Sequence, residues 1–177
     1  ISDRDGFWAE QAQLIDWQQP FEQVCDYANP PFAKWFVGGK TNLCHNAVDR
    51  HLTTRADQNA LIFVSTETGQ EKVYSFRELH AEVQRMAAVL QDLGVKQGDR
   101  VATLAWNDYR HLELYYAVSC MGAVLHTVNP RLFPEQIVWI INHAEDRVLM
   151  TDLTFLPLLE KISAQLPSIE RYVVLTD

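Results

Sequence analysis

The sequence predicts an α/β fold, with a mainly parallel sheet covered by helices and an aromatic-rich strap in front of it. From residue 60 onward, short apolar stretches alternate with longer stretches of helical periodicity. Strands that alternate with helices in this way imply parallel βαβ units. The apolar stretches carry few polar positions on either face, which is typical of strands that helices cover on both sides.

The first elements of this body are a strand pair and a long helix. Residues 60–66 and 72–75 are joined by a Gly-containing loop and predict a hairpin. Ser75 and Glu78 have the spacing of a capping box, so a helix should begin there. Gly94 follows the last apolar position and should end that helix. Its apolar face consists of Leu79, Val83, Met86, Leu90 and Leu93.

The alternation then continues to the end of the chain. Pro134 suits the first turn of a helix, because its missing N–H is not needed there. The expected strands are residues 101–105, 123–127, 147–151 and 171–175, and the expected helices are residues 109–121, 134–144 and 155–166.

Residues 1–58 form a different region, rich in aromatic residues and Pro. Helical spacing is convincing only in residues 7–17 and 43–52, and Asn42 is placed to cap the second stretch. Large aromatic residues without continuous periodicity bury their rings one at a time against a neighbouring body. We therefore expect an N-terminal strap over residues 1–58 and an incomplete α/β domain over residues 59–177.

Charge and composition exclude several classes of partner. The net charge is -8 and the pI is near 5.2, which gives no electrostatic support for binding to nucleic acid or anionic membrane. No apolar stretch approaches the roughly 20 residues of a membrane span. The start of the chain is polar, so we expect no signal peptide. Three cysteines without a C-x-x-C pair fit a reducing cytoplasm. The oligomeric state is not predicted.

Two segments look like phosphate-binding loops but lack essential features. Gly39-Lys40-Thr41 resembles the end of a P-loop, yet Lys34 stands where the first Gly is needed and no strand precedes it. Residues 65–72 contain hydroxyl groups, one Gly and a Lys, which could surround a phosphate. Two Glu residues in that loop would repel a polyphosphate, so a solvated hairpin loop is favoured.

The thiols and histidines of the chain do not form a recognisable metal site. Cys44, His45 and His51 match no zinc spacing, so we expect no metal. Cys120 has no His nearby in the sequence and is interpreted as a core thiol rather than a nucleophile. No G-x-G-x-x-G motif follows a strand, which weakens a dinucleotide-binding interpretation.

Three residues after the expected strand 123–127 are the candidate binding residues. Ligands of open α/β sheets bind at the carboxyl ends of the strands. His126 could donate or accept a hydrogen bond, Asn129 could fix the turn, and Arg131 could contact a phosphate or carboxylate. The alternative is a turn that only positions the next helix and leaves Arg131 exposed.

The first half of the chain resembles the N-terminal region of acetyl- and propionyl-CoA synthetases, more closely the propionyl enzymes. The resemblance rests on Phe7-Trp8-Ala9-Glu10 and on WFVGGKTNLCHNAVDRHL at residues 35–52. Tyr74-Ser75-Phe76-Arg77-Glu78-Leu79 is similar to the first core motif of the adenylate-forming superfamily. Gly98-Asp99-Arg100-Val101 is similar to the turn that follows its first helix.

From about residue 102 the resemblance changes to fatty-acyl-CoA and methylthiopropionyl-CoA ligases. It rests on Ala105-Trp106-Asn107, on RHLELYY at residues 110–116 and on MGAVLHTVNPRLFPEQ at residues 121–136. A propionyl-CoA synthetase would be expected to carry a Gly-Gly-Phe turn where residues 127–131 stand. The change of branch suggests a natural or artificial fusion and leaves the length of the acyl chain open.

The resemblance implies the N-terminal part of an AMP-forming acyl-CoA synthetase for short- or medium-chain acids. Such enzymes use ATP with Mg²⁺ to make an acyl-adenylate, from which CoA displaces AMP. The family's phosphate loop, ribose-binding Asp and C-terminal Lys have no counterpart in these 177 residues. We therefore expect no catalytic residue, no tightly bound cofactor and no activity of the chain alone. The alternatives are a non-catalytic folding or binding module derived from such an enzyme and, less favoured, a nucleotide-binding oxidoreductase.

Overall fold

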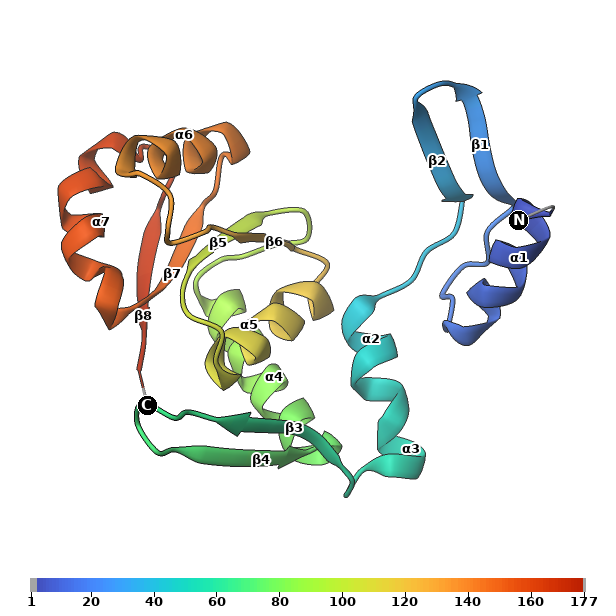
Figure 1. Ribbon diagram of the computed structural model, residues 1–177, viewed down its shortest axis with the longest axis horizontal. Coiled ribbons are helices and arrows are strands. Elements are labelled where there is room, and N and C mark those ends of the chain that lie inside the picture. Colours follow the sequence, from blue (N-terminus) through green and yellow to red (C-terminus); the bar gives the residue numbers. More distant parts are fainter. Residues whose placement is uncertain (1–2, 177) are drawn as a thin grey trace.

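The centre of the computed structural model, which describes residues 3–176, is a parallel sheet in the order β6-β5-β7-β8 (Figure 1). The four strands expected for this sheet each lie within one residue of their prediction, and all neighbours in the sheet pair in parallel. The α/β class with a mainly parallel sheet is therefore confirmed. The strands are β5 (Arg100–Leu104), β6 (Val124–Thr127), β7 (Val148–Asp152) and β8 (Arg171–Leu175).

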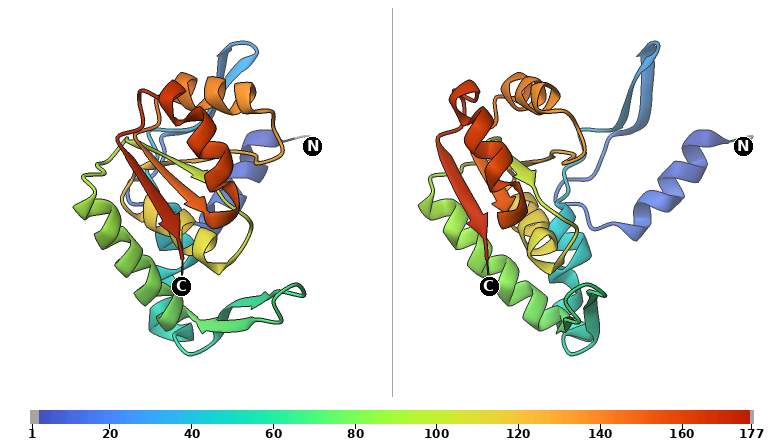
Figure 2. Two further views of the ribbon diagram at one scale, coloured as in Figure 1. Left: turned by 90° about the vertical axis from the view of Figure 1, so that its left-hand side faces the viewer. Right: turned by 60° about the vertical axis from the view of Figure 1, so that its left-hand side comes forward.

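Helices cover both faces of the sheet, as its apolar strands require. On one face, α4 (Phe76–Asp92) and α5 (Tyr109–Cys120) pack against a cluster that includes Val101. On the other face, α6 (Pro134–Ala144) and α7 (Leu156–Ile162) pack against a second cluster (Figure 2). Short 3₁₀ helices, η3 (Leu153–Phe155) and η4 (Ser163–Gln165), flank α7.

The long helix α4 begins and ends where the sequence predicts. The Ser75 side chain accepts a hydrogen bond from the Glu78 N–H, and Glu78 Oε2 accepts one from the Ser75 N–H at 2.8 Å. At the other end Gly94 has a φ of 83°, which L-residues with a side chain rarely adopt. Its apolar face buries Leu79, Val83 and Leu90, as expected.

The predicted hairpin is also present, as β3 (Asn59–Val64) and β4 (Glu71–Ser75) in antiparallel pairing. It packs beside α5 through the Phe63 and Tyr109 rings, whose centroids are 5.3 Å apart. On α5, Glu113 is a buried residue, only 7% exposed. Burial raises the pKa of Glu113 above its ordinary value, and a weaker opposing effect comes from Tyr74 and then Lys72 on β4.

The N-terminal region differs from the expected strap in both structure and position. It contains α1 (Arg4–Gln11), η1 (Ala12–Leu14) and an antiparallel hairpin of β1 (Gln23–Asn29) and β2 (Phe32–Val37). The hairpin was missed, because its strands show little alternation and Pro30-Pro31 at its turn interrupts the pattern. This unit stands away from the sheet rather than wrapping over it (Figures 1 and 2).

The aromatic rings of this N-terminal unit pack mainly against one another. The ring centroid of Phe21 lies 5.2 Å from that of Trp17 and 5.1 Å from that of Phe36. The ring centroids of Trp8 and Trp35 are 5.8 Å apart. Edge-on and tilted arrangements of this kind are favourable for aromatic pairs. The rings thus form a small cluster of their own.

A short helical segment joins the N-terminal unit to the body. It comprises α2 (Leu43–Ala47), η2 (Asp49–His51) and α3 (Leu52–Arg55). Asn42 caps α2 as predicted, since its side chain accepts from the His45 N–H at 3.1 Å. The Asn42 amide also donates to the carbonyls of Ser119 and Cys120 at 2.9 and 3.3 Å. One side chain therefore both starts α2 and ties it to the end of α5.

Replacement of Asn42 by Ala should destabilise the protein by about 1–2 kcal/mol, because a cap and two hydrogen bonds to partly buried carbonyls are lost. Urea denaturation followed by circular dichroism measures the change. The matched control is Asn107→Ala at an exposed position that makes no side-chain hydrogen bond within the described residues. Equal stability of the two variants would contradict the role given to Asn42.

Replacement of Glu113 by Gln should flatten the dependence of stability on pH. Because its pKa is raised in the fold, the contribution of Glu113 is fully present below about pH 4.5 and is lost as the pH rises through the raised value. Gln stays neutral, so the variant should be at least as stable as the wild type at pH 7. Urea midpoints between pH 4 and 8 test this, with the exposed Glu135→Gln as control. A Gln variant with the wild-type pH dependence would overturn the assignment.

Candidate functional site

The carboxyl edge of the sheet is the place where a ligand site is expected in this topology. From β5 the chain passes through α5 on one face to β6, and from β6 through α6 on the other face to β7. The loops that follow the neighbouring strands β5 and β7 therefore lead to opposite faces. Such a switch point leaves a crevice at the carboxyl ends of the two strands.

Asp152, the last residue of β7, holds the loop that follows β5. Its Oδ2 accepts a hydrogen bond from the backbone N–H of Trp106 at 2.6 Å. The Asp152 side chain is 6% exposed, and its Oδ1 has no hydrogen-bond partner among the described residues. The Trp106 ring in turn packs on Phe155 at a centroid distance of 5.0 Å. The loop after β5 is thus fixed to β7 rather than free to move.

His111 and Asp108 fix the other side of the same loop. Asp108 caps α5, since its Oδ1 accepts from the His111 N–H at 2.9 Å. The His111 ring lies with Nε2 at 3.0 Å from the Thr103 hydroxyl and Nδ1 at 3.2 Å from the Trp106 carbonyl. Both ring nitrogens are engaged within the protein, which makes His111 a support of the loop.

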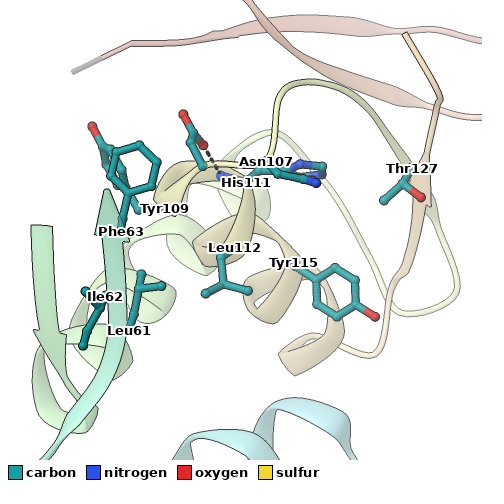
Figure 3. A pocket seen from close by; sticks show the side chains of 10 residues that line it. Leu61, Ile62, Phe63, Asn107, Tyr109, His111, Leu112, Tyr115 and Thr127 are labelled. Atoms are coloured by element: carbon teal, nitrogen blue, oxygen red, sulfur yellow. Dashed lines mark hydrogen bonds between the residues drawn. The ribbon is translucent and has the colours of Figure 1, made fainter. Parts of the chain in front are cut away.

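A cavity of about 410 Å³ opens between the β3–β4 hairpin, α5 and this edge. Figure 3 shows Leu61, Phe63, Leu112 and Tyr115 on its apolar side, with Asn107 and Thr127 at the carboxyl ends of the strands. An apolar hollow with a few polar groups at one end is the usual form of a small-molecule site. This edge can accept an apolar group beside a polar one.

The three residues predicted from the sequence are not brought together at this cavity. Asn129 Oδ1 accepts from the Arg131 N–H at 3.0 Å, so Asn129 holds the turn after β6. Arg131 is exposed and makes no ion pair within residues 3–176. His126 instead has Nδ1 at 2.6 Å from Oδ2 of Asp146, a carboxylate with no exposed surface. His126 therefore links β6 to the turn between α6 and β7.

The buried carboxylate of Asp146 explains the position of His126. Burial raises the pKa of Asp146, and the hydrogen bond from His126 acts in the opposite direction. Its Oδ1 has no hydrogen-bond partner among the described residues. A buried carboxyl group with one interaction depends strongly on that interaction.

Reasoning from the sequence missed Asp152 and His111. Asp152 directly follows the apolar strand at 148–151, which is the available signal for a polar group at the carboxyl edge. His111 carried no comparable signal, because its partner Thr103 faces it only after α5 has packed on the sheet. Within the described part of the chain, no group of three His, Cys, Asp or Glu side chains is arranged to hold a metal ion. No helix there is both long and apolar enough to cross a bilayer.

His126→Ala should destabilise the fold by about 1–3 kcal/mol at pH 7, because the buried Asp146 loses its partner. Adding Asp146→Asn should recover part of the loss, since a neutral amide is less costly to bury. Thermal denaturation measures both effects, and the exposed His143→Ala is the control. Unchanged stability of His126→Ala would contradict this packing role.

Two family models match consecutive parts of the chain. The model described as acetyl-coenzyme A synthetase N-terminus covers residues 1–47, and the one described as AMP-binding enzyme covers residues 48–177. The two matches meet at the end of α2, the short helix that Asn42 ties to α5.

Curated relatives come from both groups that the sequence motifs suggested. Propionate–CoA ligase of Escherichia coli is 55% identical over 101 residues, which are 57% of this chain and 16% of that protein. The 3-methylmercaptopropionyl-CoA ligase of Ruegeria pomeroyi is 54% identical over 112 residues, 63% of this chain and 21% of that protein. Acetyl-coenzyme A synthetase of Methylobacterium radiotolerans is 48% identical over 154 residues, 85% of this chain and 24% of that protein.

The matched region thus spans less than a quarter of the length of each of these relatives. The AMP-binding model nevertheless covers well over half of this chain and includes the whole parallel sheet. On this evidence the chain belongs to the AMP-binding enzyme family.

Proposed function

We propose that the chain is the N-terminal part of an AMP-forming acyl-CoA synthetase, which joins a short- or medium-chain carboxylic acid to CoA and converts ATP to AMP and pyrophosphate. The observation that carries the proposal is the succession of an acetyl-CoA synthetase N-terminus and an AMP-binding segment in one chain. Relatives that are named as ligases of acetate, propionate and longer acids support it.

We propose that ATP and Mg²⁺ are held mainly by segments outside the described residues. The described residues contain no arrangement of three metal-ligating side chains, and no Gly-rich stretch follows a strand of the sheet. In-line transfer at a phosphate needs backbone amides around the phosphates and positive charge at the developing anion. We assign these groups to the segments that the relatives carry beyond the matched region, and assign no catalytic residue here.

Within the chain, we propose that the turn after β6 contributes to substrate binding. Arg131 is exposed there, and the hydrogen bond from its N–H to Asn129 fixes the backbone beside it. A guanidinium in this position suits a phosphate or carboxylate group. His126 supports the turn from within β6 through Asp146.

We propose residues 1–58 as an N-terminal extension and residues 59–177 as the first part of the AMP-binding domain, with the second region starting at the β3–β4 hairpin. A cytoplasmic location is consistent with the three free cysteines and the acidic composition. The same negative charge argues against nucleic acid as a partner.

The chain alone should not catalyse carboxylate-dependent exchange of pyrophosphate into ATP. A longer protein, in which this chain is followed by the segments that its relatives carry beyond the matched region, should catalyse that exchange. Acetate, propionate and octanoate are the acids to compare. Exchange by the isolated chain above a no-protein control would overturn the assignment of the ATP site. No exchange in the longer protein would favour a non-catalytic folding or binding module.

In the longer protein, Arg131→Ala should lower kcat/KM for the substrate that Arg131 contacts by about 10- to 100-fold, the effect of one lost hydrogen bond to a charged group. Arg131→Lys should recover part of the loss. Varying ATP, acid and CoA in turn identifies the substrate concerned. Arg77→Ala, at an exposed position at the start of α4, is the control. Unchanged kinetics for all three substrates would remove Arg131 from the site.

A further inference from the structure

Two cysteines lie in one hydrophobic cluster at the junction between the N-terminal extension and the body. Cys44 lies on α2 with no exposed surface, and Cys120 is the last residue of α5 and is half-buried. Figure 1 shows α2 beside the carboxyl-terminal end of α5, and the two helices are in contact. The Asn42 amide, which donates to the Cys120 carbonyl, holds the two backbones together.

The two thiols also share one apolar environment. Cys44 belongs to the cluster between the sheet and α5, and Cys120 packs against that cluster. Burial raises the pKa of Cys44 strongly, and Asp49 and the Cys120 thiol add to the increase. The Asp49 carboxylate lies 3.9 Å from the Cys44 sulfur. Cys44 is therefore a shielded thiol, while Cys120 is partly exposed.

We propose that Cys44 and Cys120 form a disulfide when the protein meets a peroxide, and that this bond fastens the N-terminal extension to α5. Nothing in the acyl-CoA synthetase reaction requires these thiols. In a reducing cytoplasm such a bond is transient and reports on oxidation rather than serving as a permanent part of the fold.

The chemistry uses one peroxide molecule for each bond. The Cys120 sulfur attacks hydrogen peroxide, an S–O bond forms, the O–O bond breaks and water leaves, which gives a sulfenic acid. The Cys44 sulfur then attacks the Cys120 sulfur. The S–S bond forms, the S–O bond breaks, and the Cys44 proton leaves with the hydroxyl group as a second water. Two thiols are oxidised by two electrons, and the peroxide is reduced to two waters.

The bond would link residues that are far apart in the sequence. A cross-link between residues 44 and 120 removes conformational freedom from a long loop of the unfolded chain. Cys25 offers a contrast within the same protein, because it is buried in β1 of the projecting hairpin, away from α5 (Figure 2).

Peptide mapping can detect the bond directly. Trypsin leaves the three cysteines on separate peptides, residues 5–34, 41–50 and 111–131. The folded protein is treated at low concentration with hydrogen peroxide or with a phosphine reductant. Free thiols are then alkylated in denaturant, and non-reduced digests are analysed by mass spectrometry. Thermal denaturation of the same samples provides a second measurement.

After oxidation, the wild type and the Cys25→Ser variant should both contain peptide 41–50 cross-linked to peptide 111–131. Their thermal denaturation midpoint should lie about 5–10 °C above that of the reduced protein. The reductant should reverse both changes. Cys120→Ser, at the half-buried position, should show neither. Overoxidation of Cys120 with Cys44 still free, a cross-link to the Cys25 peptide, or a bond between two copies of the chain would each overturn the proposal.

Discussion

The central strand β5 is the constraint on which the rest of the structure depends. Its residues Val101–Leu104 are at most 1% exposed, because α4 and α5 cover one side and α6 and α7 the other. A strand buried on both faces must be mainly apolar, and its one polar side chain within this range, Thr103, is paired with His111. It must also pair on both edges, which it does with β6 and β7. Its connections therefore have to supply helices to both faces, and the chain changes face between α5 and α6. This change of face puts a switch point at the carboxyl ends of β5 and β7. The cavity beside it is lined by β3, the loop after β5, α5 and Thr127 of β6, so the burial of one strand fixes the edge at which the candidate site lies.

Two buried carboxylates show how the ends of this sheet are fixed. In the turn before β7, Asp146 accepts from His126; at the end of β7, Asp152 accepts from the Trp106 backbone. Each keeps one oxygen without a hydrogen-bond partner among residues 3–176. A buried carboxylate oxygen without a hydrogen bond costs free energy of folding, and this cost is tolerated where the carboxylate fixes neighbouring strands or loops. Asp152 fixes the position of the loop that borders the cavity. Asp146 holds His126 on β6, the strand that leads to Arg131. The arrangement of the carboxyl edge is thus determined from buried positions, and the exposed residues have only to contact a ligand.

The sequence was a good guide to the body and a poor one to the N-terminal unit and the site. Periodicity, the Ser75–Glu78 capping box and Gly94 are local signals, and each of them placed an element within a residue or two. The β1–β2 hairpin lacked such a signal, because its rings pack within the unit instead of alternating between a core and solvent. His126 was correctly placed on the strand, but its partner is 20 residues away and comes close only after α6 packs. His111 and Asp152 depend on similar long-range pairings, which local patterns do not encode.

The self-contained aromatic cluster changes how the N-terminal extension should be understood. Its rings contact one another while staying half-buried or exposed, and they draw little apolar surface from the body. Its attachment is instead polar: the Asp16 N–H donates to Asn46, the Thr41 hydroxyl donates to the Asp16 carbonyl, and Asp16 faces Arg50 and His45. Polar contacts of this kind at a surface are weak individually. The α2 segment, with Cys44 and Val48 fully buried and Asn42 bonded to α5, must therefore transmit nearly all of the coupling between extension and body. A single covalent bond at that segment would be enough to change it.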